Sequence, residues 1–148
     1  MITALVITSD VAPSADRLAA LSAPPDGAGT MVEEVLRTLL QSEIDGVTVV
    51  TGRQGRVIER LLQRRPCRLV HDWDWPLGDR AAAIALGMQR LPGEAEAVLV
   101  CAGDDLSLTP ARVSALIAGW RQGQTEDLSA QSGTAGAAFP AFIRRPGA

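Results

Sequence analysis

The sequence predicts an α/β fold, a three-layer, Rossmann-like, mostly parallel sheet with helices on both faces. Strand-like and helix-like segments alternate along the chain, which is typical of a parallel sheet whose strands are joined by helices. The strand-like segments are continuous apolar runs, as expected of strands buried on both faces. A length of 148 residues suits one domain with a real core, so residues 1–148 are predicted to form a single domain.

The first predicted elements are a strand, a helix and a second strand. Ala4–Ile7 is an apolar run rich in β-branched residues, and it predicts the first strand. Apolar residues recur at helical spacing from Val32 to Leu40, which predicts a helix over residues 30–41. Val47–Val50 is a second β-branched run and predicts a strand that ends before Gly52.

The middle of the chain predicts two helices around a short strand. Apolar residues between Val57 and Leu62 share one face of a helix, and Pro66 ends it. Arg68–His71 is predicted as the third strand. An alanine-rich segment then predicts a helix over residues 78–90, ended by Pro92 and Gly93.

The last third predicts a buried strand, a helix and a tail. Ala97–Cys101 is the fourth apolar run, and Thr109-Pro110 marks a helix start, with threonine as N-cap and proline in the first turn. From about residue 123 the composition turns to Gly, Ser, Thr, Gln and Ala, which predicts a weakly structured tail. Phe139–Ile143 is predicted as a last short strand, and residues 144–148 as a frayed end.

Composition excludes several classes of function. The net charge of −3 predicts no affinity for nucleic acid or for an anionic membrane surface. Apolar runs such as Ala4–Ile7 are far too short to span a bilayer, and Met1-Ile2-Thr3 lacks the basic region of a signal peptide, so a cytoplasmic location is expected. Cys67 and Cys101 have no metal-ligand spacing and are predicted as small buried apolar residues.

The types of basic residue exclude further kinds of catalytic and binding site. All 14 are arginine, and the absence of lysine excludes a phosphate-loop, Schiff-base or receiver-domain lysine. The sequence has no tyrosine and a single histidine, His71, beside which the sequence alone identifies no acid or nucleophile.

Candidate functional residues follow the predicted strands, because ligands of such sheets bind beyond the carboxyl ends of the strands. Asp104 and Asp105 follow the fourth strand and could hold Mg²⁺, although aspartates before a helix are more often loop formers. Asp72 and Asp74 form a D-x-D, a weak metal signal. Trp73 and Trp75 could stack on a base, but we expect them to cover the edge of the core.

The turn after the first strand offers few phosphate-binding groups. Residues 8–17 contain no glycine, although close approach of backbone N–H groups to a phosphate favours glycine. Asp10 and Asp16 would repel a triphosphate. Arg17 is the one compatible side chain, although arginines in such loops are more often solvated surface residues. The segment from Gly52 to Gly55 is interpreted as a turn from strand to helix.

The order of these segments resembles the molybdenum-cofactor cytidylyl- and guanylyltransferases and their broader nucleotidyltransferase-like family. Residues 47–52, VTVVTG, are similar to the family's VVVTG strand, and residues 98–110, VLVCAGDDLSLTP, to VLVLLGDQPLVTP. Residues 26–40 resemble the dG-x-PLL turn and first long helix. Residues 70–78 resemble V-x-N-P-x-W-x-x-G, with one extra residue. The likeness covers residues 2–122 and implies a nucleotide-diphospho-sugar transferase-like fold.

The resemblance also implies site residues. Asp104 falls on the family's magnesium-binding aspartate. The candidate nucleotide-binding residues are Thr8, Ser9, Arg17, Gly52, Arg53, Trp75 and Gly78. The family's opening loop, L-A-A-G-x-S-x-R-M-G-x-x-K, is largely lost, because Ser9 stands at the first glycine and nothing matches the later glycine or the lysine.

Three functional hypotheses follow. The first is a degenerate, non-catalytic relative that binds a nucleoside triphosphate weakly or acts as a protein partner in a cofactor-related or biosynthetic assembly. The second is an active Mg²⁺-dependent nucleotidyltransferase, acting by cytidylyl or guanylyl transfer to a molybdopterin-like cofactor or a small phosphorylated acceptor. The third is an unrelated small α/β binding or regulatory domain. A homo-oligomer is plausible if Trp73 or Trp75 is exposed.

Overall fold

The computed structural model describes residues 1–8, 30–53, 55–76, 80–103, 105, 107–123 and 140–144. In these residues one sheet has the strand order β3-β2-β1-β4-β5. Strands β1 to β4 are mutually parallel, and β5 runs antiparallel to β4. The prediction of a mostly parallel sheet is confirmed. The strands are β1 Ile2–Ile7, β2 Gly46–Thr51, β3 Arg68–His71, β4 Ala97–Ala102 and β5 Ala141–Arg144.

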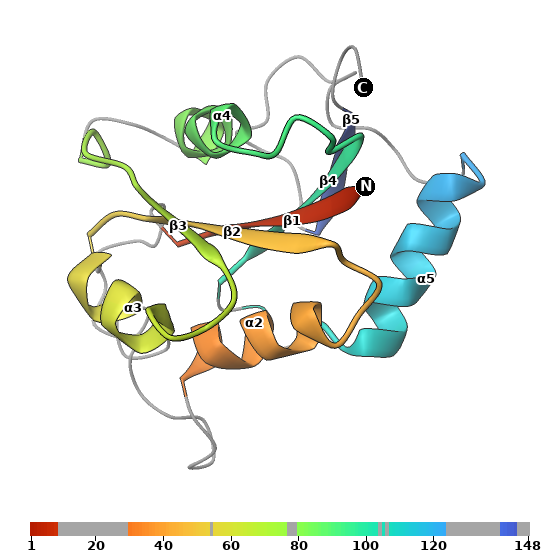
Figure 1. Cartoon of the computed structure of the whole chain (residues 1–148), viewed down its shortest axis with the longest axis horizontal. Coiled ribbons are helices and arrows are strands. Elements are labelled where there is room, and N and C mark those ends of the chain that lie inside the picture. The colour runs from red at the N-terminus through yellow and green to blue at the C-terminus, as the bar shows by residue number, and fades with distance from the viewer. Residues whose placement is uncertain are drawn as a thin grey trace.

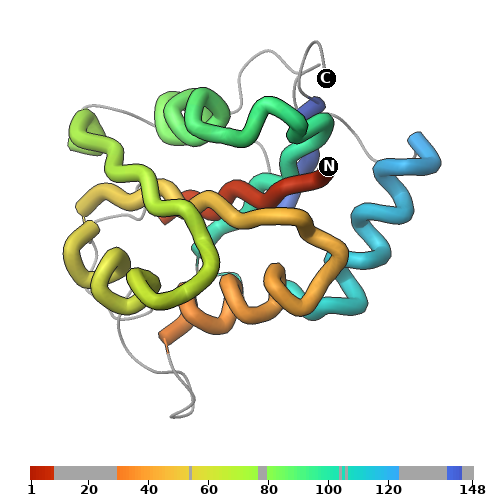
Figure 2. The backbone as a smooth tube through the Cα atoms, viewed as in Figure 1, coloured from red at the N-terminus to blue at the C-terminus, as the bar shows by residue number. Residues whose placement is uncertain are grey.

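Helices cover both faces of this sheet, as predicted (Figure 1). Helix α4 lies on one face, and α2, α3 and α5 lie on the other. Figure 2 traces β1 through the middle of the sheet, between β2 and β4. The helices are α2 Met31–Leu40, α3 Gly55–Leu62, α4 Arg80–Gln89 and α5 Pro110–Arg121.

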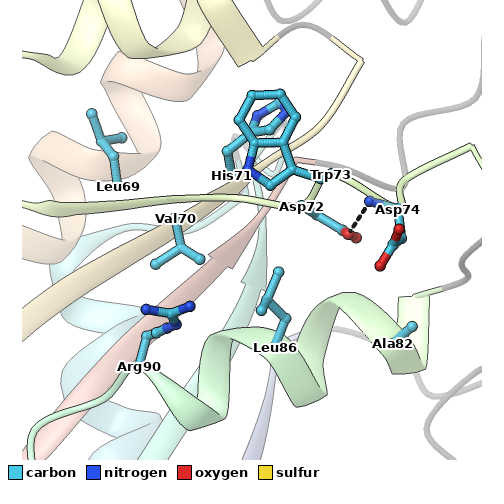
Figure 3. Close-up of a pocket in the computed structure, with 9 residues that line it drawn as sticks. All are labelled: Leu69, Val70, His71, Asp72, Trp73, Asp74, Ala82, Leu86 and Arg90. Carbon is cyan, nitrogen blue, oxygen red and sulfur yellow. Dashed lines mark hydrogen bonds between the residues drawn. The ribbon is translucent and has the colours of Figure 1, made fainter.

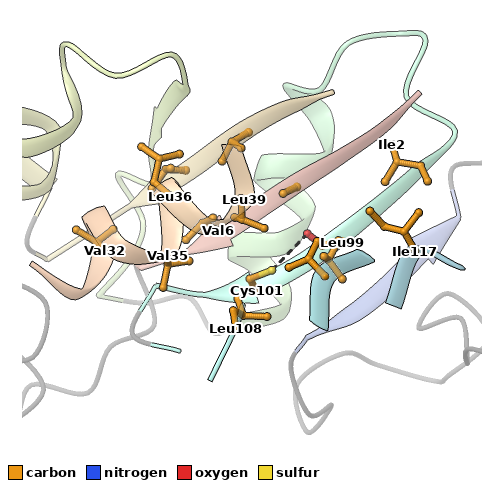
Figure 4. Close-up of a cluster of buried hydrophobic side chains, with 14 of the residues drawn as sticks. Ile2, Val6, Val32, Val35, Leu36, Leu39, Leu99, Cys101, Leu108 and Ile117 are labelled. Atoms are coloured by element: carbon orange, nitrogen blue, oxygen red, sulfur yellow. Dashed lines mark hydrogen bonds between the residues drawn. The ribbon is translucent and has the colours of Figure 1, made fainter. Parts of the chain in front are cut away.

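The apolar runs form strands because both faces of the central strands are buried. Alternate side chains of β1 enter opposite clusters: Val6 packs on the side of α2, α3 and α5, and Leu5 packs on the side of α4. Figure 4 shows the larger cluster, in which Leu36 and Leu39 of α2 lie near Val6 of β1. Fully burying one such side chain contributes roughly 1.5–3 kcal/mol.

Threonine side chains cap the amino-terminal ends of two helices. Thr30 caps α2 with a reciprocal capping box, in which Glu33 N donates to Thr30 Oγ1 and Thr30 N donates to the Glu33 carboxylate. Thr109 caps α5 by accepting from Arg112 N, with Pro110 in the first turn. Both starts agree with the sequence prediction.

The last strand corrects the prediction at its end. Arg144, expected in a frayed end, belongs to β5 and pairs with Ala97. Its guanidinium lies 4.9 Å from the Trp120 ring, which in turn stacks on Phe142 of β5 with centroids 4.9 Å apart. These ring contacts bind α5 to β5 and hold Arg144 in place. Phe139, the predicted strand start, lies outside the described residues.

No helix in the described segments is both long enough and apolar enough to cross a lipid bilayer.

Candidate functional site

Hydrogen bonds hold the carboxyl ends of four strands at a single edge of the sheet. Gly103 N donates to Ile7 O at 3.1 Å, and Thr8 N donates to Val50 O at 3.0 Å. Asp72 N donates to Thr51 O at 2.8 Å. The turns that leave β1, β2, β3 and β4 are therefore neighbours, as expected for a parallel sheet.

A cavity of about 290 Å³ opens at this edge, between the turn after β2 and the turn after β3. Three predicted nucleotide-binding residues, Gly52, Arg53 and Trp75, contribute to its wall. We call it the strand-end cavity; it is lined by Gly52, Arg53, Gly55, Arg56, Val57, His71, Trp73 and Trp75.

The turn from β2 to α3 supplies the positive side of the strand-end cavity. Gly55 N donates to Gly52 O at 2.9 Å, so the turn is tight, as predicted. Arg53 and Arg56 are exposed, and neither makes an ion pair or hydrogen bond to another described residue. Their guanidinium groups thus remain able to bind an anion.

His71 is fixed at the end of β3 by two residues that sequence reasoning missed. Its Nδ1 lies 3.0 Å from Thr51 Oγ1 and 3.7 Å from Glu59 Oε1. Thr51 Oγ1 donates to Glu59 Oε1 at 3.2 Å. A hydroxyl has one proton, so Thr51 then accepts from His71 Nδ1–H, which leaves Nε2 of the neutral ring as an acceptor.

The Thr51–Glu59–His71 cluster could not be found by spacing alone. Thr51 and His71 are 20 residues apart and meet only because β2 and β3 pair with Thr51 beside His71. Glu59 reaches the pair from the second turn of α3. The signals available in the sequence were the single histidine and a threonine at a predicted strand end.

Trp73 lies against His71 but does not cover the core. Its ring meets the His71 ring edge-on, with centroids 4.3 Å apart and an interplanar angle of 71°. Trp73 is 83% exposed, so the expectation that it shields the core edge is wrong. The reason is the turn after β3, in which Asp72 Oδ1 accepts from Asp74 N at 3.0 Å and directs residue 73 outward.

Two further cavities flank β3, one on each face of the sheet. On the α4 side, Asp72, Leu86 and Arg90 are among the residues that line a cavity of about 430 Å³ (Figure 3). On the α3 side a cavity of about 720 Å³ is lined by Arg56, Glu59, Arg60, Gln63, Leu69 and His71. His71 lines both of these and the strand-end cavity as well.

Thr8, a further predicted site residue, is buried at the end of β1. Its Oγ1 donates to Val50 O at 2.6 Å, so the hydroxyl closes the β1–β2 ladder. Ser9, Arg17, Gly78 and Asp104 lie outside the described residues.

Near the end of β4, Asp105 behaves as a loop former. Its Oδ1 accepts from Ser107 N at 3.0 Å and from the Ser107 hydroxyl. Among the described residues, no three His, Cys, Asp or Glu side chains cluster as a metal cage would require.

Solved structures of nucleotidyl-transfer proteins share this fold. A nucleotidyl transferase from Methanothermobacter is 25% identical, with a TM-score of 0.64, over 78% of this chain and 56% of that one. This chain thus spans little more than half the length of that relative. Rv0371c from Mycobacterium tuberculosis, also solved in complex with manganese, has a TM-score of 0.71 at 16% identity, over 97% of this chain and 71% of that one.

A third similar structure contains a nucleotide. The CMP:2-keto-3-deoxy-manno-octonic acid synthetase complexed with CTP has a TM-score of 0.66 at 17% identity, over 82% of this chain and 47% of that one. At 16% and 17% identity, the similarity of this chain to Rv0371c and to the synthetase shows the fold alone. No curated protein matches the chain.

The sequence model of the MobA-like NTP transferase domain matches residues 21–146, most of the chain. This match overturns the hypothesis of an unrelated α/β domain. The match also agrees with the strand order of the sheet, with the helices on both of its faces and with the similar solved structures. The chain belongs to the MobA-like NTP transferase domain family.

Proposed function

We propose that this chain is a nucleotidyltransferase-like domain that binds a nucleotide weakly at the strand-end cavity and does not catalyse its transfer. The observation that carries the binding proposal is that one cavity combines aromatic rings with two arginines that make no ion pair or hydrogen bond to another described residue. Arg53 and Arg56 offer planar donors suited to phosphate oxygens, and Trp73 and Trp75 offer faces on which a base can stack.

The composition of the turn after β1 supports weak binding without turnover. Nucleotidyl transfer depends on positioning the triphosphate and stabilising its developing charge. The chain has no lysine, and residues 8–17 contain no glycine. Losing a single charge-stabilising donor typically costs about 2.7–4 kcal/mol of barrier, a factor of 10²–10³ in rate, and here several donors are missing.

Calorimetric titration with CTP and GTP in the presence of Mg²⁺ tests the binding. We expect Arg53→Ala to weaken binding by roughly 10- to 100-fold, since a hydrogen bond to a charged group contributes about 1.5–3 kcal/mol. Arg64→Ala is the matched control, because Arg64 is also an exposed arginine but does not line the cavity. Equal affinities of the two variants would refute the site.

A pyrophosphate-release assay tests the absence of catalysis. The expected result is no release above the uncatalysed rate with Mg²⁺ or Mn²⁺ and a range of phosphorylated acceptors. Steady release by the wild-type chain would refute this half of the proposal.

A second candidate function is an active Mg²⁺-dependent nucleotidyltransferase. It is favoured by the bond from Gly103 N to Ile7 O, because Gly103 directly precedes Asp104 and the bond draws the end of β4 to the end of β1. One carboxylate with substrate phosphates is a donor set that suits Mg²⁺, so Asp104 fits the ion. When bound, the metal would neutralise phosphate charge.

Under this second function the acceptor would be a molybdopterin-like cofactor or a small phosphorylated molecule. It predicts that Asp104→Ala abolishes pyrophosphate release, while Asp105→Ala, which removes the bond to Ser107, retains it. Equal rates for the two variants would reject the role of Asp104.

A further inference from the structure

Strand β3 is an open edge of the sheet in the described part of the chain. It stands at one end of the strand order and pairs with β2 alone. None of its four residues is fully buried, whereas every residue of β1 is. An edge strand that carries unpaired N–H and C=O groups can pair with a strand of another chain. The β3 edge is therefore a candidate interaction surface.

Two residues of β3 direct their backbone hydrogen-bonding groups away from β2. Asp72 N donates to Thr51 O, so the even-numbered residues at this end of β3 face β2. Because the backbone groups of successive residues point to opposite sides of a strand, the N–H and C=O groups of Leu69 and His71 point to the open side. No hydrogen bond engages these outward groups within the described segments. They form a short template for a further strand.

Cavities lie on both faces of the sheet at this edge. Leu69 and His71 line both the cavity of about 430 Å³ on the α4 side and the cavity of about 720 Å³ on the α3 side. In Figure 3, Val70 lies on the same side of the strand as Leu86, and Leu69 lies on the opposite side. A strand added at the edge can thus place its alternate side chains over the two cavities.

We propose that a second copy of this chain binds at the β3 edge, so that the two β3 strands pair in an antiparallel, two-fold symmetric dimer. The outward groups select the register. Placing Leu69 opposite His71 of the second copy engages every one of them. A shift in one direction would need Cys67 N, which already donates to Arg65 O at 2.8 Å. A shift in the other direction would need residue 73, which lies in the turn beyond β3.

Side chains on the α4 side complement one another in this register. Val70 meets Val70 of the second copy at the two-fold axis, and Arg68 lies opposite Asp72. The guanidinium of Arg68 donates to Arg90 O through one nitrogen, which leaves its other donors available. Asp72 and the exposed Asp74 line the α4-side cavity.

This complementarity favours a second copy as the occupant. A charged side chain on an edge strand ordinarily opposes pairing with another chain. In the symmetric dimer, however, each Arg68 faces a carboxylate of the other copy, so the charge supports the pairing. An uncharged extended peptide would leave Arg68 without such a partner.

Sedimentation velocity over a series of protein concentrations tests the dimer. The wild-type chain should show a reversible monomer–dimer equilibrium, and a monomer at every concentration would overturn the proposal. Val70→Lys should raise the dimer dissociation constant roughly tenfold or more, because like charges then meet at the axis. Val70 belongs to neither buried cluster, so the fold should persist. An unchanged dissociation constant in this variant would also overturn the proposal.

Leu40→Lys is the matched control. Leu40 is likewise a partly exposed apolar residue, at 39%, but it lies on α2 and lines neither of the cavities that flank β3. This variant should dimerise like the wild type. Dimerisation weakened equally by Leu40→Lys and Val70→Lys would mean that the added charge acts without regard to the β3 edge, against the proposal.

A mixture of Val70→Lys and Val70→Glu tests the two-fold axis. Each variant alone brings like charges together and should be mainly monomeric. A mixed dimer brings opposite charges together, so mixing should restore dimerisation, which also shows that both variants are folded. If two variants that unfold as cooperatively as the wild type remained monomeric on mixing, Val70 would not lie on the axis and the proposed register would be wrong.

Hydrogen exchange of the β3 amides tests the pairing in the unmodified protein. The N–H groups of Leu69 and His71 bond only to the second copy, so their exchange should slow as the protein concentration rises. The N–H of Val70 faces β2 and should already be protected in the monomer. Exchange of Leu69 and His71 that did not depend on concentration would overturn the proposal, even for a protein that dimerised.

Discussion

The His71 ring fills the space beside Gly55, where any side chain on Gly55 would collide with it. A Cβ atom built on Gly55 would lie 2.6 Å from both Cε1 and Nδ1 of the ring and 3.4 Å from Thr51 Oγ1. Gly55 is the first residue of α3, so this contact couples the start of the helix to the end of β3. The absence of a side chain at residue 55 is thus what lets His71 reach Thr51 and Glu59.

Gly55→Ala is therefore expected to displace the His71 ring and break its contact with Thr51. We expect a loss of about 1–3 kcal/mol in the free energy of unfolding, the usual cost of overpacking, which exceeds the gain in helix propensity of up to ~1 kcal/mol. Urea denaturation measures the loss.

Gly93→Ala is the control for this prediction. Nothing lies within 4 Å of a Cβ built on Gly93, so its stability should change by less than about 0.5 kcal/mol. The displacement of His71 would be contradicted if the two alanine variants were equally stable.

Much of the fold could be predicted because its strands carry strong local signals. Ala4–Ile7 and Ala97–Cys101 are apolar runs, and the structure buries each of these residues within β1 and β4. The third strand was predicted with its observed bounds. The final strand could not be located as well, because its end is fixed by pairing with Ala97 and by the Trp120 ring, which are distant in sequence.

The candidate site was predicted only in part. Gly52, Arg53 and Trp75 were chosen separately and meet in one cavity because parallel strands end at one edge. The meeting of Thr51 and Glu59 with His71 depends on strand register and on the placement of α3, which local sequence does not encode.

The capping box of α2 predicts a pH dependence of stability. Burial raises the pKa of Glu33, but hydrogen bonds from the Thr30 side chain and backbone and from Arg65 outweigh it, so the pKa is lowered from the ordinary 4.5. A lowered pKa in the folded state means that the ionised carboxylate stabilises the fold above pH about 4.5. This contribution is lost as the pH falls through the folded pKa.

We therefore expect Glu33→Gln to be less stable than wild type by about 1 kcal/mol at pH 7, with the difference closing toward pH 3. Urea denaturation at a series of pH values measures this difference. A difference that stayed constant from pH 7 to pH 3 would show that ionisation of Glu33 makes no contribution.

The two cysteines should differ in reactivity. Burial, with a smaller contribution from Asp105, raises the pKa of Cys101 to about 12. Burial also raises the pKa of Cys67, but this residue is only half-buried. Because the thiolate is the reactive form, a disulfide reagent at pH 8 should label Cys67 slowly in the folded protein and Cys101 only after unfolding in urea.

Cys67→Ser separates the two thiols in this experiment. The folded variant should show almost no labelling. In urea, Cys101 should become fully labelled at a rate set by unfolding. Rapid labelling of folded Cys67→Ser would contradict the burial of Cys101 in β4.

Helix α4 lies close to the sheet at Gly87, and this contact leaves no room for a methyl group. A Cβ built on Gly87 would lie 2.5 Å from Leu5 Cδ1 and 3.0 Å from Val50 Cγ2. Gly87→Ala should therefore lower the free energy of unfolding by about 1–3 kcal/mol, although alanine alone favours a helix by up to ~1 kcal/mol.

A double-mutant cycle with Leu5→Val tests this cause. Shortening Leu5 removes the clashing methyl groups, so the double variant should be more stable than the sum of the single effects predicts, with a coupling energy of about 0.5–3 kcal/mol. Urea denaturation of the four proteins gives the cycle. If the two effects on the free energy of unfolding added strictly, the contact between Leu5 and residue 87 would not be the cause of the loss. Helix α4 would then move away from the sheet as a whole.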